Sequence, residues 1–337
     1  MQRRTLIQLA GPAVAAVAAL PWLSANRSHA NQPATAHQPQ AMTASTQPSA
    51  PHTTPFTLQA LPGLKPSPRM PVVFVGHGSP MNAIEDNHWR RGWQALGAQF
   101  GDGPQAIYPL PQLILCISAH WITRGWEITA MEKPVTIHDF GGFPQALFEV
   151  HYPAPGAPAV AEALAAQLHQ PHTRQPLGLD EHQWGLDHGT WSVLKPMFPQ
   201  ANIPVLQLSM DYSRQPAEHL ALGQQLHSLR EQGVLIVGSG NIVHNLGAMH
   251  RTVSDTQAHD WALEFDAVTA RHIRNGNHDA LANFLSLGKM AKLAHPTHDH
   301  YLPLLYTAGA THASEPVRFV NEGFQMAAIS MRSAVWG

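Results

Sequence analysis

The sequence predicts an α/β protein, a single domain in which a mostly parallel central sheet is flanked by helices. Short, continuous apolar runs such as 72–75 and 234–237 are typical of strands that are buried on both faces of a sheet. These runs alternate with longer segments whose apolar residues recur at helical spacing, an order that is typical of parallel sheets. Hydrophobic residues make up 44% of the 337 residues, which is enough for a large core.

Strands are predicted at short apolar runs that are bounded by glycine, proline or polar residues. In chain order these runs are 72–76, 113–118, 127–131, 205–210 and 234–237. The chain is expected to close with two further strands that pair antiparallel, at 317–320 and 326–330.

Helices are predicted where apolar residues share one face. In the segment 89–100 these residues are Trp89, Trp93, Leu96 and Phe100. The remaining predicted helices, in chain order, are 157–169, 190–197, 217–232, 258–274, 280–285 and 301–309.

Residues 1–30 have the features of a signal peptide of the twin-arginine type. Arg3 and Arg4 precede an apolar stretch, and Ser28-His29-Ala30 offers a small-residue cleavage site. An ordinary secretory signal is the alternative. We expect a periplasmic protein that is exported by the twin-arginine machinery. Residues 31–70, rich in Gln, Pro, Thr, Ala and Ser, are expected to form a disordered linker, which leaves 71–337 as the folded domain.

Charge and cysteine content exclude several classes of function. The net charge is −2 and only 12% of residues are charged, so no basic surface is available for nucleic acid or for a membrane in the mature form. The segment Ser239-Gly240-Asn241 lacks the lysine of a phosphate-binding loop, which argues against nucleotide binding. Cys116 is the single cysteine and lies in an apolar run, so we expect a buried, inert thiol.

Histidine is more common than lysine and arginine together, 23 residues against 20. Five histidines directly follow or open apolar elements: His77, His120, His188, His244 and His300. Ligands bind at the carboxyl ends of strands in open α/β sheets, and imidazole is both a metal ligand and a proton shuttle. The sequence therefore predicts a histidine-lined metal site. The alternatives are a solvated turn residue for His77, a core residue for His120 and a helix-start residue for His188.

Two further residues are candidates for contacts to a substrate. His138 lies in the aromatic, glycine-rich stretch 138–144, which could form a loop that covers the site. Asn245 follows His244, and its amide could bind a polar substrate or orient the imidazole.

Six motifs, in this order, resemble the class III extradiol ring-cleavage dioxygenases. The resemblance is greatest to their DODA type, the 4,5-DOPA dioxygenase extradiol branch, and it covers about residues 70–337. The motifs lie at 76–82, 118–121, 138–144, 185–191, 238–246 and 299–304. Any one motif alone would be weak, whereas six in order are specific.

The resemblance implies a catalytic domain at 71–337 that uses a non-haem Fe(II). Such enzymes insert both atoms of O₂ into a catechol ring, next to the diol. Carried over by motif, His77 and His120 would be metal ligands, and His300 would take the third ligand position. His244 would be either a further ligand or the acid–base residue, and His188 would contact the substrate or oxygen.

The expected ligand shell departs from that of the better-known members, which have glutamate at the third position. The matching motif here contains no acidic residue except Asp299, so an all-histidine shell is expected. Three or four imidazoles also suit Zn(II), which could occupy the same site. Zinc has no redox chemistry, so a zinc-loaded protein would be inactive in ring cleavage.

Two other readings of the same residues stay open. One is a zinc-dependent hydrolase, for which Glu181 or Asp187 could serve as the carboxylate base. The other is a non-enzymatic, Memo-like protein that binds metal or peptide on the same fold. Ring cleavage of a small catechol, DOPA-like or other, is favoured because the chain keeps both His188 and His244.

Overall fold

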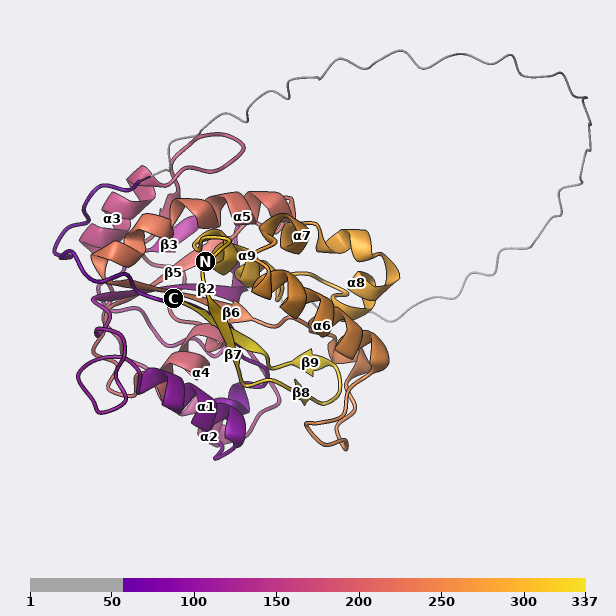
Figure 1. The fold of residues 1–337 in the computed structure, drawn as a ribbon. Helices are drawn as coiled ribbons and strands as arrows, with labels where there is room; N and C mark the ends of the chain where they lie inside the picture. The colour runs from indigo at the N-terminus through magenta and orange to yellow at the C-terminus, as the bar shows by residue number, and fades with distance from the viewer. Residues whose placement is uncertain (1–56) are drawn as a thin grey trace, which may run out of the picture. The chain divides into compact units, whose positions relative to one another are not determined.

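An eight-stranded sheet with the order β4-β3-β5-β2-β6-β1-β10-β7 forms the centre of the molecule (Figure 1). This computed structural model describes residues 57–337, and the predicted α/β class is confirmed. The signal peptide predicted at 1–30 and the linker up to residue 56 lie outside the described residues. In sheet order the strands are Gly178–Asp180 (β4), Glu127–Thr129 (β3), Val205–Met210 (β5), Leu113–Ile122 (β2), Val234–Gly240 (β6), Val72–Gly76 (β1), Ser333–Trp336 (β10) and Val317–Val320 (β7).

The four neighbouring strands in the middle of the sheet, β5, β2, β6 and β1, run parallel. The pairs of β10 with β1 and β7, and of β3 with β5, are antiparallel. Every residue of β1, β5 and β6 is buried, as their continuous apolar runs predict. Because the central strands are parallel, the carboxyl ends of β1, β6 and β2 meet at one edge of the sheet, where ligands bind in open α/β folds.

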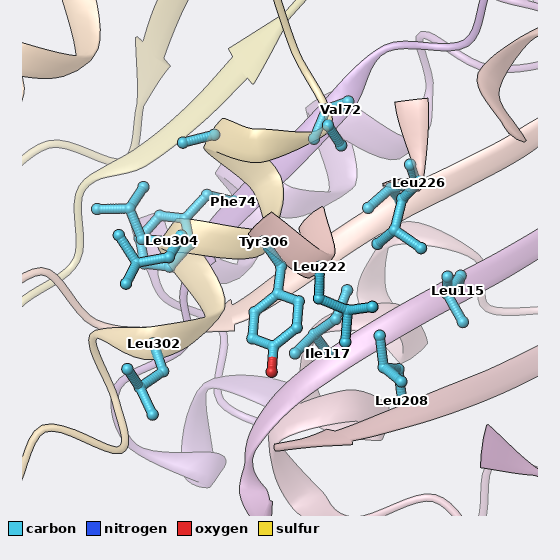
Figure 2. Close-up of a cluster of buried hydrophobic side chains, with 14 of the residues drawn as sticks. Val72, Phe74, Leu115, Ile117, Leu208, Leu222, Leu226, Leu302, Leu304 and Tyr306 are labelled. Carbon is cyan, nitrogen blue, oxygen red and sulfur yellow. The ribbon is translucent and has the colours of Figure 1, made fainter. Parts of the chain in front are cut away.

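Helices cover both faces of the sheet (Figure 1). They are His88–Gly97 (α1), Gln145–Phe148 (α2), Pro158–Gln167 (α3), His188–Met197 (α4), Pro216–Gln225 (α5), Asp260–Arg274 (α6), His278–Ala282 (α7), Lys289–Ala294 (α8) and Leu302–Gly309 (α9). Val73 and Val75 of β1 share a core with α1, α2 and α4. Val72 and Phe74 point to the other face and share a core with α3, α5, α6 and α9, part of which Figure 2 shows.

Side-chain caps set where two of these helices begin. The Asn87 side chain accepts the N–H of Arg90 at the start of α1. The Asp187 side chain accepts the N–H of Thr190 at the start of α4. Such a cap satisfies a backbone donor that the first turn leaves unpaired, and it contributes about 1 kcal/mol. The cap of α4 matters for function, because it fixes His188 as the first residue of the helix.

The prediction of a disordered linker up to residue 70 is wrong for residues 57–70. Leu58 and Leu61 are buried in the core. Their backbone N–H groups donate to Ser228 Oγ at 2.9 Å and to Gln232 Oε1 at 2.8 Å. The prediction from composition failed because two isolated leucines and a few hydrogen bonds hold this segment in place. Such contacts leave no periodic apolar pattern in the sequence.

The predicted antiparallel pair at the end of the chain has the wrong second strand. The partner of β7 is β10, which the sequence did not single out. The segment 326–330 instead begins with a turn, in which Met326 and Ala327 have positive φ angles of 51° and 63°. This turn joins the short strands Phe324–Gln325 (β8) and Ile329–Ser330 (β9), which form a two-stranded sheet of their own.

The remaining differences concern short elements and helix ends. The helix predicted at 217–232 is divided into α5 and the 3-10 helix His227–Gln232 (η2), which ends at Gly233 with φ 73°. That predicted at 280–285 is α7 followed by the 3-10 helix Phe284–Leu287 (η4). Two more 3-10 helices, Pro80–Ala83 (η1) and Leu246–Ala248 (η3), and the elements β4, α2 and α8 were not predicted, since segments this short carry little periodicity.

Cys116 is fully buried in β2, as predicted, and its Sγ accepts a hydrogen bond from Thr190 Oγ1 at 3.3 Å. Burial raises the pKa of this thiol far above its usual value, which fits an inert side chain. Across residues 57–337, no helix combines the length and the apolar character needed to cross a bilayer.

A buried ion pair ties the end of the domain to η2. The Arg230 side chain is 0% exposed and its guanidinium forms a two-pronged pair with the Glu315 carboxylate, one arm being Nη1 to Oε2 at 2.8 Å. The same guanidinium donates to Met70 O at 2.7 Å and to Ala310 O at 3.2 Å. The two carboxylate oxygens and the two carbonyl oxygens together stabilise the buried charge, because burying a guanidinium without partners costs folding free energy.

We expect Glu315→Gln to lower the free energy of unfolding by about 3 kcal/mol, because it leaves the Arg230 charge buried and unpaired. Urea unfolding at pH 7 measures this. Glu231→Gln is the matched control, since Glu231 pairs with Arg69 where both side chains are about half exposed, 55% and 46%, and such pairs contribute less than about 1 kcal/mol. Equal losses in the two variants would contradict the prediction.

The same pair predicts a pH dependence. Burial alone would raise the pKa of Glu315, but the hydrogen bond and charge of Arg230 outweigh it and lower the pKa below its usual value. The stabilisation is therefore complete above the unfolded pKa of about 4.3 and is lost as the pH falls through the lower folded pKa. The difference in stability between wild type and Glu315→Gln should shrink over that acidic range.

Candidate metal centre

The parallel register of the sheet brings His77 and His120 together. In the ladders, β6 lies between β1 and β2, with Gly76 opposite Gly240 and Ser118 opposite Ser239. His77 directly follows β1, as predicted. The strand predicted to end at Ser118 continues to Ile122, so His120 lies within β2. It lies within an irregularity in the register between Ile117 and Ile122, the kind of feature that can re-aim a side chain at the end of a strand.

The other two histidines of the centre come from helix starts. His188 is the first residue of α4, and His300 lies in the turn just before α9. The carbonyl of His300 accepts the N–H of Asn241 at 2.8 Å, which docks this turn onto the end of β6. A Cβ at Gly240 would lie 2.2 Å from that carbonyl, so the approach requires glycine.

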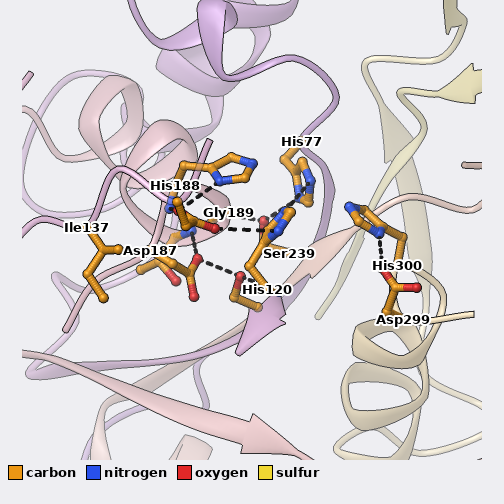
Figure 3. Close-up of polar contacts among 12 residues, drawn as sticks. His77, His120, Ile137, Asp187, His188, Gly189, Ser239, Asp299 and His300 are labelled. Atoms are coloured by element: carbon orange, nitrogen blue, oxygen red, sulfur yellow. Dashed lines mark hydrogen bonds and ion pairs between the residues drawn. The ribbon is translucent and has the colours of Figure 1, made fainter. Parts of the chain in front are cut away.

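His77, His120 and His300 form a compact cluster of possible ligands (Figure 3). One ring nitrogen from each lies within 4.8 Å of the others. The Nε2 atoms of His77 and His120 are only 3.3 Å apart. His77 and His300 are 2% and 5% exposed, so this cluster lies at a buried end of the strands.

Hydrogen bonds at Nδ1 fix the tautomer of two of these rings. Ser239 Oγ donates its single proton to Gly189 O at 2.5 Å, so it must accept from His77 Nδ1 at 3.0 Å. His300 Nδ1 lies 2.6 Å from a carboxylate oxygen of Asp299, to which it donates. In both rings Nδ1 carries the proton and Nε2 keeps its lone pair, which is the form that binds a metal.

The ionisation of the cluster also suits metal binding. Burial lowers the pKa of His77 and of His300 well below the usual value, and the neighbouring imidazoles lower it further. Burial and His188 together lower the pKa of His120 to about 3, although Asp139 opposes them. These imidazoles are neutral at pH 7, so each has a ring-nitrogen lone pair that it can offer to a cation. The donor set of three imidazoles fits a divalent metal such as Fe(II) or Zn(II).

A cavity of about 620 Å³ opens above the cluster. His77, His120, His188, His244 and His300 all line it. Its walls are largely apolar and include two phenylalanine rings, which suits a small aromatic molecule. The apolar lining comprises Pro80, Met81, Phe140, Phe143, Leu246, Met249, Met326 and Ile329, and the polar lining includes Ser79, Glu85, Arg251 and Gln325.

This combination of a histidine cluster and an aromatic-lined cavity agrees with the comparisons to known proteins. The family described as the catalytic LigB subunit of aromatic ring-opening dioxygenase matches residues 71–337. The chain belongs to this family of extradiol dioxygenases. Ring-cleaving dioxygenases of the LigB family are metal-dependent, which agrees with the histidine cluster.

Several relatives of this LigB-family chain are named 4,5-DOPA dioxygenase extradiol. That of Escherichia coli K12 is 47% identical over 277 residues, which cover 80% of this chain and 96% of the relative. That of Beta vulgaris is 33% identical over 251 residues, 74% of this chain and 90% of the relative. A crystal structure of an uncharacterized protein from Escherichia coli K12 matches with a TM-score of 0.67 and 40% identity, over 80% of this chain and all of that one.

In this LigB-family site, His244 lies beside the ligand cluster. Its ring stacks on that of His300, with the centroids 3.5 Å apart and the planes 3° from parallel. No nitrogen of His244 belongs to the ligand groups found among residues 57–337. Burial lowers the pKa of His244 to about 4; Asp299 raises it and His188 lowers it further. Of the two roles expected for His244, this position favours the acid–base role.

His138 and Asn245 are not among the residues that line this cavity, and their contacts to a substrate stay a prediction. His138 Nε2 bonds to Val150 O at 3.0 Å, which closes the base of the aromatic loop. The Asn245 amide donates to Leu293 O at 2.7 Å and accepts the N–H of Ala248, which caps η3. Both side chains hold loops in place. Their motif neighbours His244 and Asp139 are the ones that reach the centre.

The sequence missed the carboxylates that orient the imidazoles. Asp139 contacts His188 and His120, and Asp299 contacts His300. The available signal was that each aspartate lies next to a histidine in a motif, but adjacency alone does not show which way a side chain points.

We expect His77→Ala, His120→Ala and His300→Ala each to reduce metal affinity by more than the roughly 10- to 100-fold that loss of an outer partner costs. Each change removes one of three imidazole ligands. Isothermal titration with Zn(II) measures the affinity, and His138→Ala, outside the cavity, is the control. The prediction fails if one of the three variants binds Zn(II) as tightly as His138→Ala does.

Proposed function

We propose that this chain is a metal-dependent extradiol dioxygenase that opens the ring of a small catechol next to its diol. The observation that carries the proposal is the set of three imidazoles, two buried and one half-buried, whose ring nitrogens converge in an aromatic-lined cavity, with His244 stacked beside them. The relatives named 4,5-DOPA dioxygenase extradiol support a catechol substrate.

We propose Fe(II) as the active metal, held by His77, His120 and His300. When bound, Fe(II) supplies a template for the two catechol oxygens and for O₂. Zn(II) suits the same three imidazoles but has no redox chemistry, so we propose that it is an inactive occupant.

Two histidines of the chain, His244 and His188, would take part in proton transfer and hydrogen bonding to the substrate. His244 is neutral at pH 7 because its pKa is about 4, so it can accept a proton from a catechol hydroxyl and later return it. His188 lines the cavity, with its Nδ1 2.9 Å from a carboxylate oxygen of Asp139, and its Nε2 would be the nitrogen that accepts from the substrate or oxygen. Phe140 and Phe143 exclude water from one side of the substrate and offer it aromatic faces.

The zinc hydrolase alternative is not supported by either of the two bases that the sequence suggested. Glu181 is exposed and does not line the cavity. Asp187 is fully buried, and its carboxylate is occupied by donors from Ser118, Gln207 and Trp184 as well as by the α4 cap. Neither carboxylate can activate a water in the cavity.

The test is reconstitution of the purified protein with Fe(II) under anaerobic conditions. A panel of catechols is then added with air, and oxygen uptake and visible absorbance are recorded. We expect uptake together with a yellow ring-opened product. One tightly bound metal per chain with no uptake for any catechol would overturn the proposal and would favour a metal- or peptide-binding protein.

We expect His244→Ala to lower kcat by about 100- to 10,000-fold, which is the usual contribution of general acid–base catalysis. Zn(II) affinity and the melting temperature should stay near the wild-type values, because His244 lies outside the ligand cluster. His250→Ala is the control, since His250 is exposed in the same stretch of chain. Wild-type turnover by His244→Ala would remove this residue from the mechanism, and loss of Zn(II) binding would make it a ligand.

We propose that the protein acts in the periplasm after export by the twin-arginine route. The paired Arg3 and Arg4 before an apolar stretch support this. That route carries folded proteins, so the metal could be inserted before export. Fractionation of cells that produce the full chain tests the proposal, and protein that stays with the cytoplasmic fraction would contradict it.

A further inference from the structure

The open end of the cavity carries one positive and one negative side chain. Arg251 and Glu85 both line the cavity, and both residues are exposed to solvent. His77 and His300 line the same cavity but are buried. The cavity therefore has a buried end, which holds the ligand cluster, and an open end, which holds two opposite charges.

Backbone hydrogen bonds attach both charged residues to the cavity wall. Glu85 comes just after η1, and its N–H donates to Met81 O at 2.9 Å. Arg251 directly follows His250, whose N–H donates to Met326 O at 2.9 Å. Met81 and Met326 are themselves part of the wall. The fold thus places the two charges at the opening through the backbone at or next to each residue.

The neutral polar side chains of the wall, apart from the histidines, already have protein partners. Gln325 Oε1 accepts the N–H of Ser79 at 2.9 Å, and Gln325 Nε2 donates to Asn82 Oδ1 at 2.9 Å. The Ser79 hydroxyl caps η1. Among residues 57–337, the side chains of Arg251 and Glu85 form no hydrogen bond and no ion pair, either with each other or with another residue. Both charges are therefore free to bind a ligand.

The size of the cavity leaves room for a substituent on the ring. A volume of about 620 Å³ is larger than a bare catechol needs, so a ring whose hydroxyls face the histidine cluster can carry a side chain toward the opening. A guanidinium binds a carboxylate through two parallel hydrogen bonds, and a carboxylate binds an ammonium group. An α-amino acid side chain supplies both partners on one carbon atom.

We propose that Arg251 and Glu85 are specificity residues, which bind the carboxylate and the ammonium group of a catechol with a zwitterionic side chain. The preferred substrates are then catechols that are α-amino acids, rather than neutral catechols or catechols of a single charge. The two residues together have no net charge, which favours a zwitterion over an anion or a cation. This inference rests on the proposed function, in which the diol lies at the histidine cluster.

Four catechols with the same ring separate the two charges. The compound 3,4-dihydroxyphenylalanine carries both, 3-(3,4-dihydroxyphenyl)propionate only the carboxylate, dopamine only the ammonium group, and 4-ethylcatechol neither. Calorimetry without oxygen measures their dissociation constants on the Zn(II)-loaded wild-type protein, in which the metal has no redox chemistry. We expect the zwitterion to bind about 10-fold more tightly than 4-ethylcatechol, because an ion pair of exposed groups contributes up to about fivefold.

Two variants assign the charges to residues. We expect Arg251→Gln to weaken binding about fivefold for the two catechols that carry a carboxylate, and Glu85→Gln to weaken it by a similar factor for the two that carry an ammonium group. Arg271→Gln and Glu264→Gln are the matched controls, since both residues are exposed on α6 and neither lines the cavity. Both control proteins should bind all four catechols as the wild type does.

The outcomes separate a charge-specific role from a general one. Equal affinity of the wild type for all four catechols would overturn the inference, and so would equal losses in Arg251→Gln and Arg271→Gln. A loss for all four catechols in Arg251→Gln would show an effect on the wall as a whole and would overturn it too. Binding of none of the four would overturn this inference and the proposed function together. The charge-specific pattern, combined with an Fe(II)-loaded protein that opens no catechol, would support the inference and count against ring cleavage alone.

Discussion

The parallel register of β1, β6 and β2 is the constraint on which the whole site depends. It places Gly76 beside Gly240 and Ser118 beside Ser239, so the residues that follow these strand ends start from neighbouring positions. His77 can then reach Ser239 across the sheet, and His120 can reach His77. A shift of one residue in either ladder would exchange the faces of the strand and separate the two imidazoles.

The geometry of the site also depends on the contacts that each imidazole makes at Nδ1, the ring nitrogen that faces away from the cluster. Ser239 and Asp299 accept from Nδ1 of His77 and of His300, which leaves Nε2 of these two rings for the centre. Asp139 lies close to Nδ1 of His188 and of His120. These partners are themselves tied to the fold: Ser239 donates to Gly189 of α4. The result is a group of neutral bases that lacks a carboxylate among its three nearest ligands, so the site adds no negative charge of its own to a bound divalent metal.

Much of this could be predicted from the sequence, for reasons that also explain what was missed. Continuous apolar runs predicted the positions of β1, β5 and β6, and the histidines at the ends of such runs were the candidate ligands. Leu58, Leu61 and the strand β10 were missed because their contacts are with residues far away in the chain. His138 and Asn245 were placed in the site because they adjoin it in sequence, whereas their side chains bond to Val150 and Leu293.

The glycines at the end of β6 show how local sequence and distant packing meet. Their pattern could suggest a phosphate loop, but Gly238 and Gly240 both lie inside the strand β6, against which α9 packs. A Cβ at Gly238 would lie 2.6 Å from Pro303 O, and one at Gly240 would lie 2.2 Å from His300 O. Their role is therefore to let the start of α9 lie directly on the sheet. That close approach brings His300 to within 5.2 Å of His77, measured between ring centroids, and so completes the group of three ligands.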